Sequence, residues 1–322
     1  MNAPDINAIA IANAVALLEA HPDFKIVSRF QTNDVYTADD DTPKGVLMVL
    51  DTETTGLDPE VDVVFELGYV MVEYSKTTGN IHRVLDRYCG QEDPGFELSE
   101  ETVKITGVNY ELEVKGKTLD RPKIQADIAR TTLVLAHNAE FDRKMVEKIF
   151  PEFEKKPWMC SFVQGPWKEM GFGSSKLDYL LVMAANKFHE AHRALVDCEA
   201  LLHLLATPGP DNRSVFSHIL EKGREPSYVI WANGSGFDTK DILKKNGYRW
   251  SDGSEPGKFK AWYKRGVTDP DAEIVFLQTS IYKRPETIYI DQIDAFDDFS
   301  TRTGLRDTCE IVPIKSAGLR PR

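Results

Sequence analysis

The chain has 322 residues, of which 42% are hydrophobic and 28% charged, proportions that are ordinary for a soluble globular protein. Its formal net charge of −12 argues against a uniformly basic nucleic-acid coat, but not against an enzyme that holds nucleic acid through metal ions and a local basic patch. No apolar run reaches the length of a membrane span, so we expect no membrane partner. The four cysteines are scattered without a Cys-x-x-Cys pair, which predicts a reduced, cytoplasmic setting.

The chain divides into three parts by composition. Residues 1–43 predict an N-terminal extension, with an amphipathic helix over about 6–20 and a short strand at 24–30. The helix breakers Pro208-Gly209-Pro210 mark the end of a domain over residues 44–207. Residues 208–322 then predict a smaller α+β accessory domain.

The first domain is predicted to be organised around one buried strand. The apolar run Val46–Leu50 favours a strand covered on both faces, and it ends in Asp51, Glu53 and the turn residue Gly56. Because residues i and i+2 of a strand point to the same face, Asp51 and Glu53 are expected to project side by side. Two adjacent carboxylates need a partner, and a hard divalent cation is the simplest one; solvated acids at a strand end are the alternative.

The other elements predict an α/β domain with a mixed sheet. Two strands form a hairpin, a fourth strand is short and buried, and a segment of irregular structure separates two groups of helices. The strands are 61–74, 81–89 and 132–136; the helices are about 100–106, 121–130, 140–150, 176–186 and one after Asp197; the irregular segment is 152–176.

Further acids stand at element ends, where α/β domains usually place their sites. Asp142 opens one predicted helix and Asp197 another, with His192 five residues before Asp197. Five residues turn a helix by roughly 500°, so His192 and Asp197 face one site only if His192 lies in the loop before the helix. A neutral imidazole there could take a proton from a water bound to the metal.

Three motifs in order resemble the DEDDh 3′–5′ exonucleases, the family that includes the proofreading epsilon subunit of bacterial DNA polymerase III and its stand-alone relatives. The likeness covers roughly residues 45–205. Its motifs are Asp51-Thr52-Glu53-Thr54-Thr55-Gly56-Leu57, then His137-Asn138-Ala139-Glu140-Phe141-Asp142, then His192-Arg193-Ala194-Leu195-Val196-Asp197.

The resemblance implies an RNase H-like fold and two divalent cations, Mg²⁺ or Mn²⁺, as cofactors. The implied metal ligands are Asp51, Glu53, Asp142 and Asp197, with His192 as the general base. A pair of ions would stabilise the attacking water and the leaving 3′ oxygen of an in-line displacement. His189 is a rival base, but it lies eight residues before Asp197 and is interpreted as a loop residue.

The resemblance also implies contacts with the terminal nucleotide. The implied residues are Thr54, Thr55, Leu57, Glu66, His137, Asn138 and Phe141. Plain core packing is the alternative for Leu57 and Phe141, and helix capping is the alternative for Asn138.

The accessory domain is locally basic. Lys244, Lys245, Arg249 and Lys260 interleave with aromatic residues, a pattern that suits single-stranded nucleic acid. The alternative, which we favour for Trp250 and Trp262, is that the tryptophans form the core of a small domain.

We therefore predict a metal-dependent 3′–5′ exonuclease that releases nucleoside monophosphates. Its partner is nucleic acid with a free 3′ end, DNA being favoured over RNA, and a homodimer is a further expectation from the family. An exoribonuclease with the same chemistry is the first alternative. A non-catalytic nucleic-acid-binding protein is the second, although such a protein would need neither the four acids nor the histidine.

Overall fold

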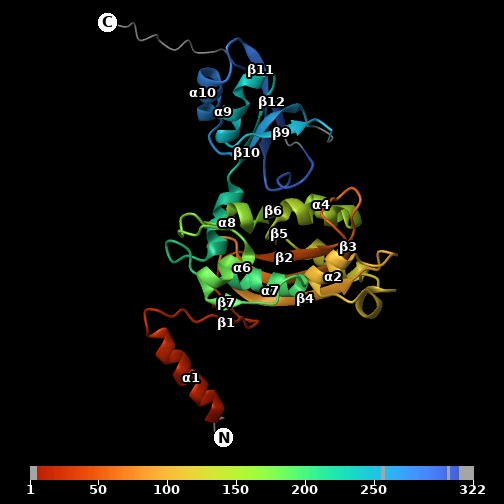
Figure 1. Cartoon of the computed structure of the whole chain (residues 1–322), viewed down its shortest axis with the longest axis vertical. Helices are drawn as coiled ribbons and strands as arrows, with labels where there is room; N and C mark the ends of the chain where they lie inside the picture. The colour runs from red at the N-terminus through yellow and green to blue at the C-terminus, as the bar shows by residue number, and fades with distance from the viewer. Residues whose placement is uncertain (1–5, 255–257, 303–304, 312–322) are drawn as a thin grey trace. The chain divides into compact units, whose positions relative to one another are not determined.

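The computed structural model describes residues 6–254, 258–302 and 305–311 (Figure 1). The chain forms two compact units: residues up to Asn138 together with Cys160–Ile219, and Ala139–Met159 together with the residues from Leu220 onward. The domain limits expected from the sequence stay predictions, and this division differs from them in grouping 139–159 with the C-terminal residues. Among the described residues, no helix is long and apolar enough to cross a membrane.

The first sheet has five strands in the order β4-β3-β2-β5-β6. Its centre is β2, which pairs antiparallel with β3 and parallel with β5, so the sheet is mixed as predicted. The run Leu47–Leu50 is fully buried, as its Val- and Leu-rich sequence predicts. The strands are β2 Lys44–Thr54, β3 Val64–Ser75, β4 Ile81–Gln91, β5 Leu133–Ala136 and β6 Trp158–Cys160.

Helices follow the strands of this sheet along the chain, and their ends match the sequence signals. Ser99 caps α2 by accepting a hydrogen bond from the Thr102 N–H, and Gly107 ends it at φ 68°. Asp120 caps α3 in the same way through the Lys123 N–H. The elements in this part of the chain are α2 Glu100–Thr106, the π-helical turn η1 Tyr110–Val114, α3 Arg121–Arg130 and α4 Ala139–Ile149.

Helix α7 (Ala194–Leu205) packs against β2 and β3. The approach is so close that a Cβ at Gly68 of β3 would lie 2.4 Å from the Ala194 carbonyl carbon, so glycine is required there. Leu201, Leu202, Leu204 and Leu205 of α7 are buried. The packing fixes the start of α7, which carries the third motif, against the strand beside β2.

The segment between α4 and α7 differs from the prediction. Residues 152–176 are not wholly irregular, because they contain several short elements. These elements are too short to produce a periodic pattern in the sequence. The helix expected over 176–186 is one α-helical turn followed by a π-helical turn, ended by Asn186 at φ 53°. The elements are η2 Pro151–Lys155, β6, α5 Ser161–Gln164, α6 Leu177–Leu180, η3 Leu181–Ala185 and β7 Lys187–Phe188.

The N-terminal extension contains the expected helix, α1 (Ile6–Glu19). No single apolar face is buried, since Ile9, Ile11, Leu17 and Leu18 are all exposed. The expected strand shrinks to β1, Ser28–Arg29, which pairs parallel with β7.

The second unit has its own five-stranded sheet in the order β12-β11-β8-β10-β9. Helices α9 and α10 cover one face, where Leu243 and Leu277 pack with Ile230 and Ile288 (Figure 1). The strand β12 is absent from the sequence prediction, because its residues Leu-Arg-Asp-Thr-Cys-Glu-Ile are mostly polar. After α8 (Val215–Arg224), in which the first unit ends and the second resumes, the elements are β8 Ser227–Ala232, η4 Phe237–Thr239, α9 Lys240–Lys245, β9 Arg249–Asp252, β10 Lys260–Val267, α10 Pro270–Ser280, β11 Glu286–Ile293 and β12 Leu305–Ile311.

Candidate active site

Three of the predicted metal ligands meet at the C-terminal end of β2. Carboxylate oxygens of Asp51, Glu53 and Asp197 all lie within 4.8 Å of one another, and each side chain is partly buried. Asp51 and Glu53 are alternate residues of β2, so they share one face, and Asp197 comes from the first turn of α7. The side-by-side placement expected from the sequence is therefore found.

This donor set fits a hard divalent cation. Three carboxylates at this separation repel one another, and oxygen-only ligation is what Mg²⁺, Mn²⁺ and Ca²⁺ prefer. Asp51, Glu53 and Asp197 can each offer an oxygen to the same ion.

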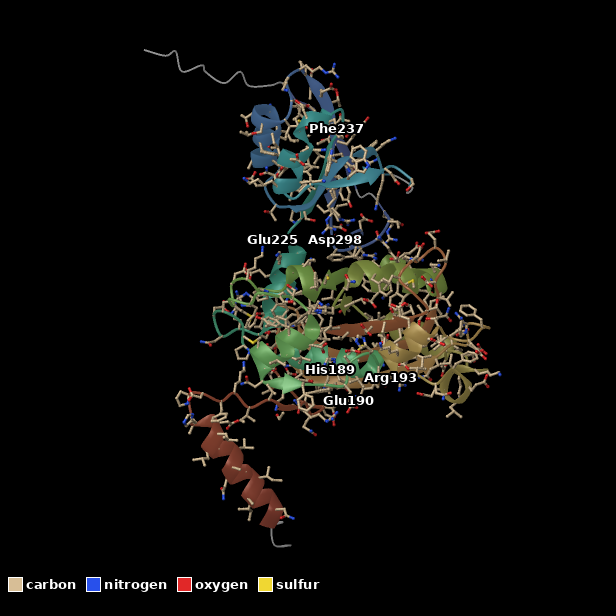
Figure 2. The ribbon with its side chains drawn as sticks, viewed as in Figure 1. His189, Glu190, Arg193, Glu225, Phe237 and Asp298 are labelled. Atoms are coloured by element: carbon tan, nitrogen blue, oxygen red, sulfur yellow. The ribbon has the colours of Figure 1, made fainter. Side chains whose placement is uncertain are left out.

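Asp197 is held by three hydrogen bonds. The Nε2–H of His189 donates to its Oδ1 at 2.6 Å, and the backbone N–H groups of His192 and Arg193 donate to its Oδ2 at 2.8 and 3.1 Å. Each carboxylate oxygen has two lone pairs, so Oδ1 keeps one for an ion. The His189 side chain is only 1% exposed, and its Nδ1 lies 3.3 Å from an Asp178 oxygen. His189, labelled in Figure 2, is thus a loop residue, as expected, and it is also a hydrogen-bond partner of Asp197.

His192 lies in the loop before α7, as its spacing from Asp197 led us to expect, and its role as the base stays a prediction. It is exposed, in the loop two residues before α7 begins, while Asp197 is in the first turn of that helix. Its φ of 72° is rare for a residue with a side chain, and such conformations cluster at functional sites. The strained backbone turns the His192 N–H onto Asp197.

Asp142 stays a predicted fourth ligand. It is 3% exposed in the first turn of α4, a helix that begins three residues after β5 ends. Strand β5 runs parallel to β2, so both strands end at the same edge of the sheet.

The turn after β2 is braced from within. The Thr54 hydroxyl donates to the Gly56 carbonyl at 2.6 Å, and the Thr55 hydroxyl donates to Asp62 at 2.9 Å. Asp62 also accepts the Asp58 N–H at 2.9 Å, so one carboxylate ties both sides of the turn. Leu57 is left 84% exposed, which rules out core packing as its role.

We expect Asp62→Ala to lower the free energy of unfolding by about 1–3 kcal/mol, because it removes two hydrogen bonds to a charged acceptor. Urea unfolding measures the change. Glu60→Ala is the matched control, since Glu60 lies exposed in the same turn and carries the same charge. Equal stability of the two variants would show that Asp62 does not brace the turn.

Glu66 is fully buried and holds the start of α7. Its Oε2 accepts hydrogen bonds from the Arg193 guanidinium and from the Gln91 amide, each at 3.0 Å, and its Oε1 accepts one from the Ala194 N–H at 2.9 Å. The hydrogen bond with Glu66 raises the pKa of Arg193, which keeps this arginine charged. A contact between Glu66 and a sugar stays a prediction. The sequence did not reveal the Arg193–Glu66 pair, because 127 residues separate its members.

His137 is held by two hydrogen bonds, and its predicted contact with the substrate stays a prediction. Its Nε2–H donates to the Ser175 carbonyl and its Nδ1 accepts from the Ser161 hydroxyl, each at 2.8 Å. Burial lowers its pKa to about 4, so the ring is neutral at physiological pH. Asn138 is exposed and Phe141 is partly buried, and their substrate contacts stay predictions.

The predicted accessory residues Lys244, Lys245, Arg249 and Lys260 are all exposed. Trp262 packs against the core of the second sheet, as we favoured, and the Lys244 Nζ lies 5.8 Å from its ring centroid. Trp250 is 52% exposed, so the core interpretation is wrong for this tryptophan. It lies on the edge strand β9, where its ring centroid is 5.6 Å from that of Trp262.

Residues 48–205 match the family model described as Exonuclease. This segment, just under half of the chain, contains all three motifs and is similar to exonucleases.

Curated relatives are similar over the same region. A PolC-type DNA polymerase III of Thermotoga maritima is 31% identical over 101 residues, which is 31% of this chain and 7% of the polymerase. A PolC-type DNA polymerase III of Pediococcus pentosaceus is 29% identical over 175 residues, which is 50% of this chain and 11% of the polymerase. The chain thus spans only a small part of the length of these relatives.

Solved structures show looser similarity. The zinc-bound complex of E. coli exonuclease I with single-stranded DNA aligns with a TM-score of 0.45 at 14% identity, covering 69% of this chain and 62% of that one. Exonuclease X in complex with 5′ overhanging duplex DNA aligns with a TM-score of 0.36 at 19% identity, covering 53% of this chain and 99% of that one.

Proposed function

We propose that this chain is a metal-dependent 3′–5′ exonuclease that hydrolyses phosphodiester bonds of DNA and releases nucleoside monophosphates. The observation that carries the proposal is the cluster of Asp51, Glu53 and Asp197 beside the loop of His192. The exonuclease-family match over residues 48–205 supports the same reaction. DNA is favoured because the curated relatives are DNA polymerases by name.

In the proposed mechanism, Asp51, Glu53, Asp142 and Asp197 would hold two Mg²⁺ or Mn²⁺ ions. An ion bound there would supply Lewis-acid stabilisation of the negative charge on the scissile phosphate. His192 takes a proton from the attacking water, and its place in an exposed loop gives it room to move. Asp197 is kept in position by His189 and by the backbone of the His192 loop.

The proposed resting place of the 3′-terminal nucleotide is the turn from Thr54 to Leu57. The exposed Leu57 side chain offers an apolar surface beside the terminal base. Exposed Lys244, Lys245, Arg249 and Lys260 are proposed as accessory contacts to the nucleic acid.

Labelled oligonucleotides test this function. Single-stranded DNA and RNA, each labelled at the 3′ or the 5′ end, are incubated with the protein in Mg²⁺, Mn²⁺ or EDTA. We expect mononucleotides to be released first from the 3′ end of DNA, with no release in EDTA. Release that persists in EDTA, or that begins at the 5′ end, would contradict the mechanism. Faster release from RNA than from DNA would show that RNA is the preferred substrate.

A further inference from the structure

The second unit has a pocket on the face of its sheet that α9 and α10 do not cover. Side chains alternate between the faces along β8, so Ile230 joins the helix-covered core while Trp231 points to the opposite face. The hollow there has a volume of about 340 Å³, counting its solvent-open part. Its polar lining consists of Lys258, Arg265, Arg302, Asp291, Ser300 and Thr301, with Trp231 and Tyr263 among the apolar walls.

The lining of this pocket is predominantly cationic. Lys258, Arg265 and Arg302 face Asp291 as the single acidic lining residue. Asp291 is 2% exposed, and it already accepts hydrogen bonds at 2.8 Å from the Trp231 indole N–H and from Arg306. Two of the lining cations also form ion pairs with carboxylates outside the lining, Arg265 with Asp298 and Arg302 with Glu147.

The wall of the pocket is fastened to helix α4. Arg143, fully buried, donates hydrogen bonds of 2.6 Å to the carbonyls of Phe296 and Asp298. Arg302 makes a two-point ion pair with Glu147, at 2.9 and 3.0 Å. Both anchors belong to the second unit, and Figure 2 labels Asp298 in the anchored loop.

Helix α4 is also the helix that carries Asp142, the residue before Arg143. The pocket therefore holds a fixed position relative to this predicted metal ligand.

We propose that Lys258, Arg265 and Arg302 form a subsite for the phosphate backbone of the substrate strand, beside the helix that carries Asp142. The inference rests on the proposed function, and it names residues other than the exposed lysines of α9. Arginine and lysine are the side chains that bind phosphate, and Thr301 adds a hydroxyl to the same lining. The anchors on α4 keep the subsite at one distance from Asp142, which belongs to the same unit.

The test uses Lys258→Ala, which removes one positive charge, and Lys258→Glu, which replaces it with a negative charge. Lys283→Ala and Lys283→Glu are the matched controls, because Lys283 belongs to the same unit and its side chain is 82% exposed. We expect the Lys258 variants to raise KM for a long single-stranded oligonucleotide by about threefold for each unit of charge. The plot of log binding constant against log salt concentration should also become less steep, by about 0.7 for the alanine variant and about 1.4 for the glutamate variant. The Lys283 variants should change neither.

A single-nucleotide substrate separates this subsite from the chemistry. The p-nitrophenyl ester of thymidine 5′-phosphate has no upstream phosphates, so we expect the Lys258 variants to hydrolyse it as the parent does. Equal KM for the oligonucleotide in the Lys258 and Lys283 variants would overturn the subsite. Binding of the oligonucleotide in EDTA compares the same variants without turnover. If the parent protein has no nuclease activity, the proposed function is wrong, but the binding comparison still tests the subsite. Arg265→Gln, which keeps a donor for Asp298, should weaken binding in the same direction.

Discussion

The Asp51→Asn variant is expected to lose at least about 10³-fold in turnover on single-stranded DNA. Removing a carboxylate ligand weakens or displaces the ion, and the Lewis-acid stabilisation lost with it amounts to several kcal/mol. Folding should not suffer, because a neutral amide at this position would relieve repulsion among three carboxylates that lie within 4.8 Å. Initial rates in Mn²⁺, with circular dichroism of both proteins, measure the two effects.

The same variant reports on the ion directly. We expect Mn²⁺ to raise the Tm of the parent, since a ligand at 100 times its Kd adds about 2.7 kcal/mol of stability, and we expect this rise to shrink in Asp51→Asn. Asp23→Asn is the control, because the Asp23 side chain is 82% exposed and lies in the N-terminal extension. If Asp51→Asn keeps both the parental rate and the parental Tm rise, Asp51 is not a metal ligand.

The local parts of this site could be predicted from the sequence because short-range rules govern them. The period of two along β2 placed Asp51 beside Glu53, and the helical period placed His192 outside α7 with Asp197 inside it. Cap residues such as Ser99 and Gly107 likewise set helix ends within a few residues of themselves.

The parts that escaped prediction depend on contacts between distant residues. Nothing near Glu66 in the sequence indicates that it holds Arg193, and the fully buried Arg143 binds carbonyls about 155 residues later. The strand β12 forms because its backbone pairs antiparallel with β11. Its own polar composition does not predict a strand. The role of His189 was underestimated for a similar reason: sequence distance from Asp197 hid a direct hydrogen bond.

Replacing the two histidines near Asp197 is expected to impair different properties of the enzyme: the proton transfer in one case and the affinity for the metal ion in the other. Replacing His192 with asparagine should lower kcat by about 10²–10⁴-fold, the usual contribution of a general base, while the Mn²⁺-induced rise in Tm is retained. Its side chain is exposed, and only its backbone N–H contacts Asp197, so the variant keeps that hydrogen bond.

Replacing His189 should instead weaken the ion site. His189→Ala removes the donor that holds Asp197 Oδ1 at 2.6 Å, and loss of such a partner typically costs 10- to 100-fold in metal affinity. A higher Mn²⁺ concentration should therefore restore the activity of this variant, but not that of His192→Asn. His189→Gln is the matched variant, because its amide can donate from nearly the place of Nε2 and should keep most of the affinity. If His189→Gln instead loses as much kcat as His192→Asn at saturating Mn²⁺, the two assignments are reversed and His189 is the base.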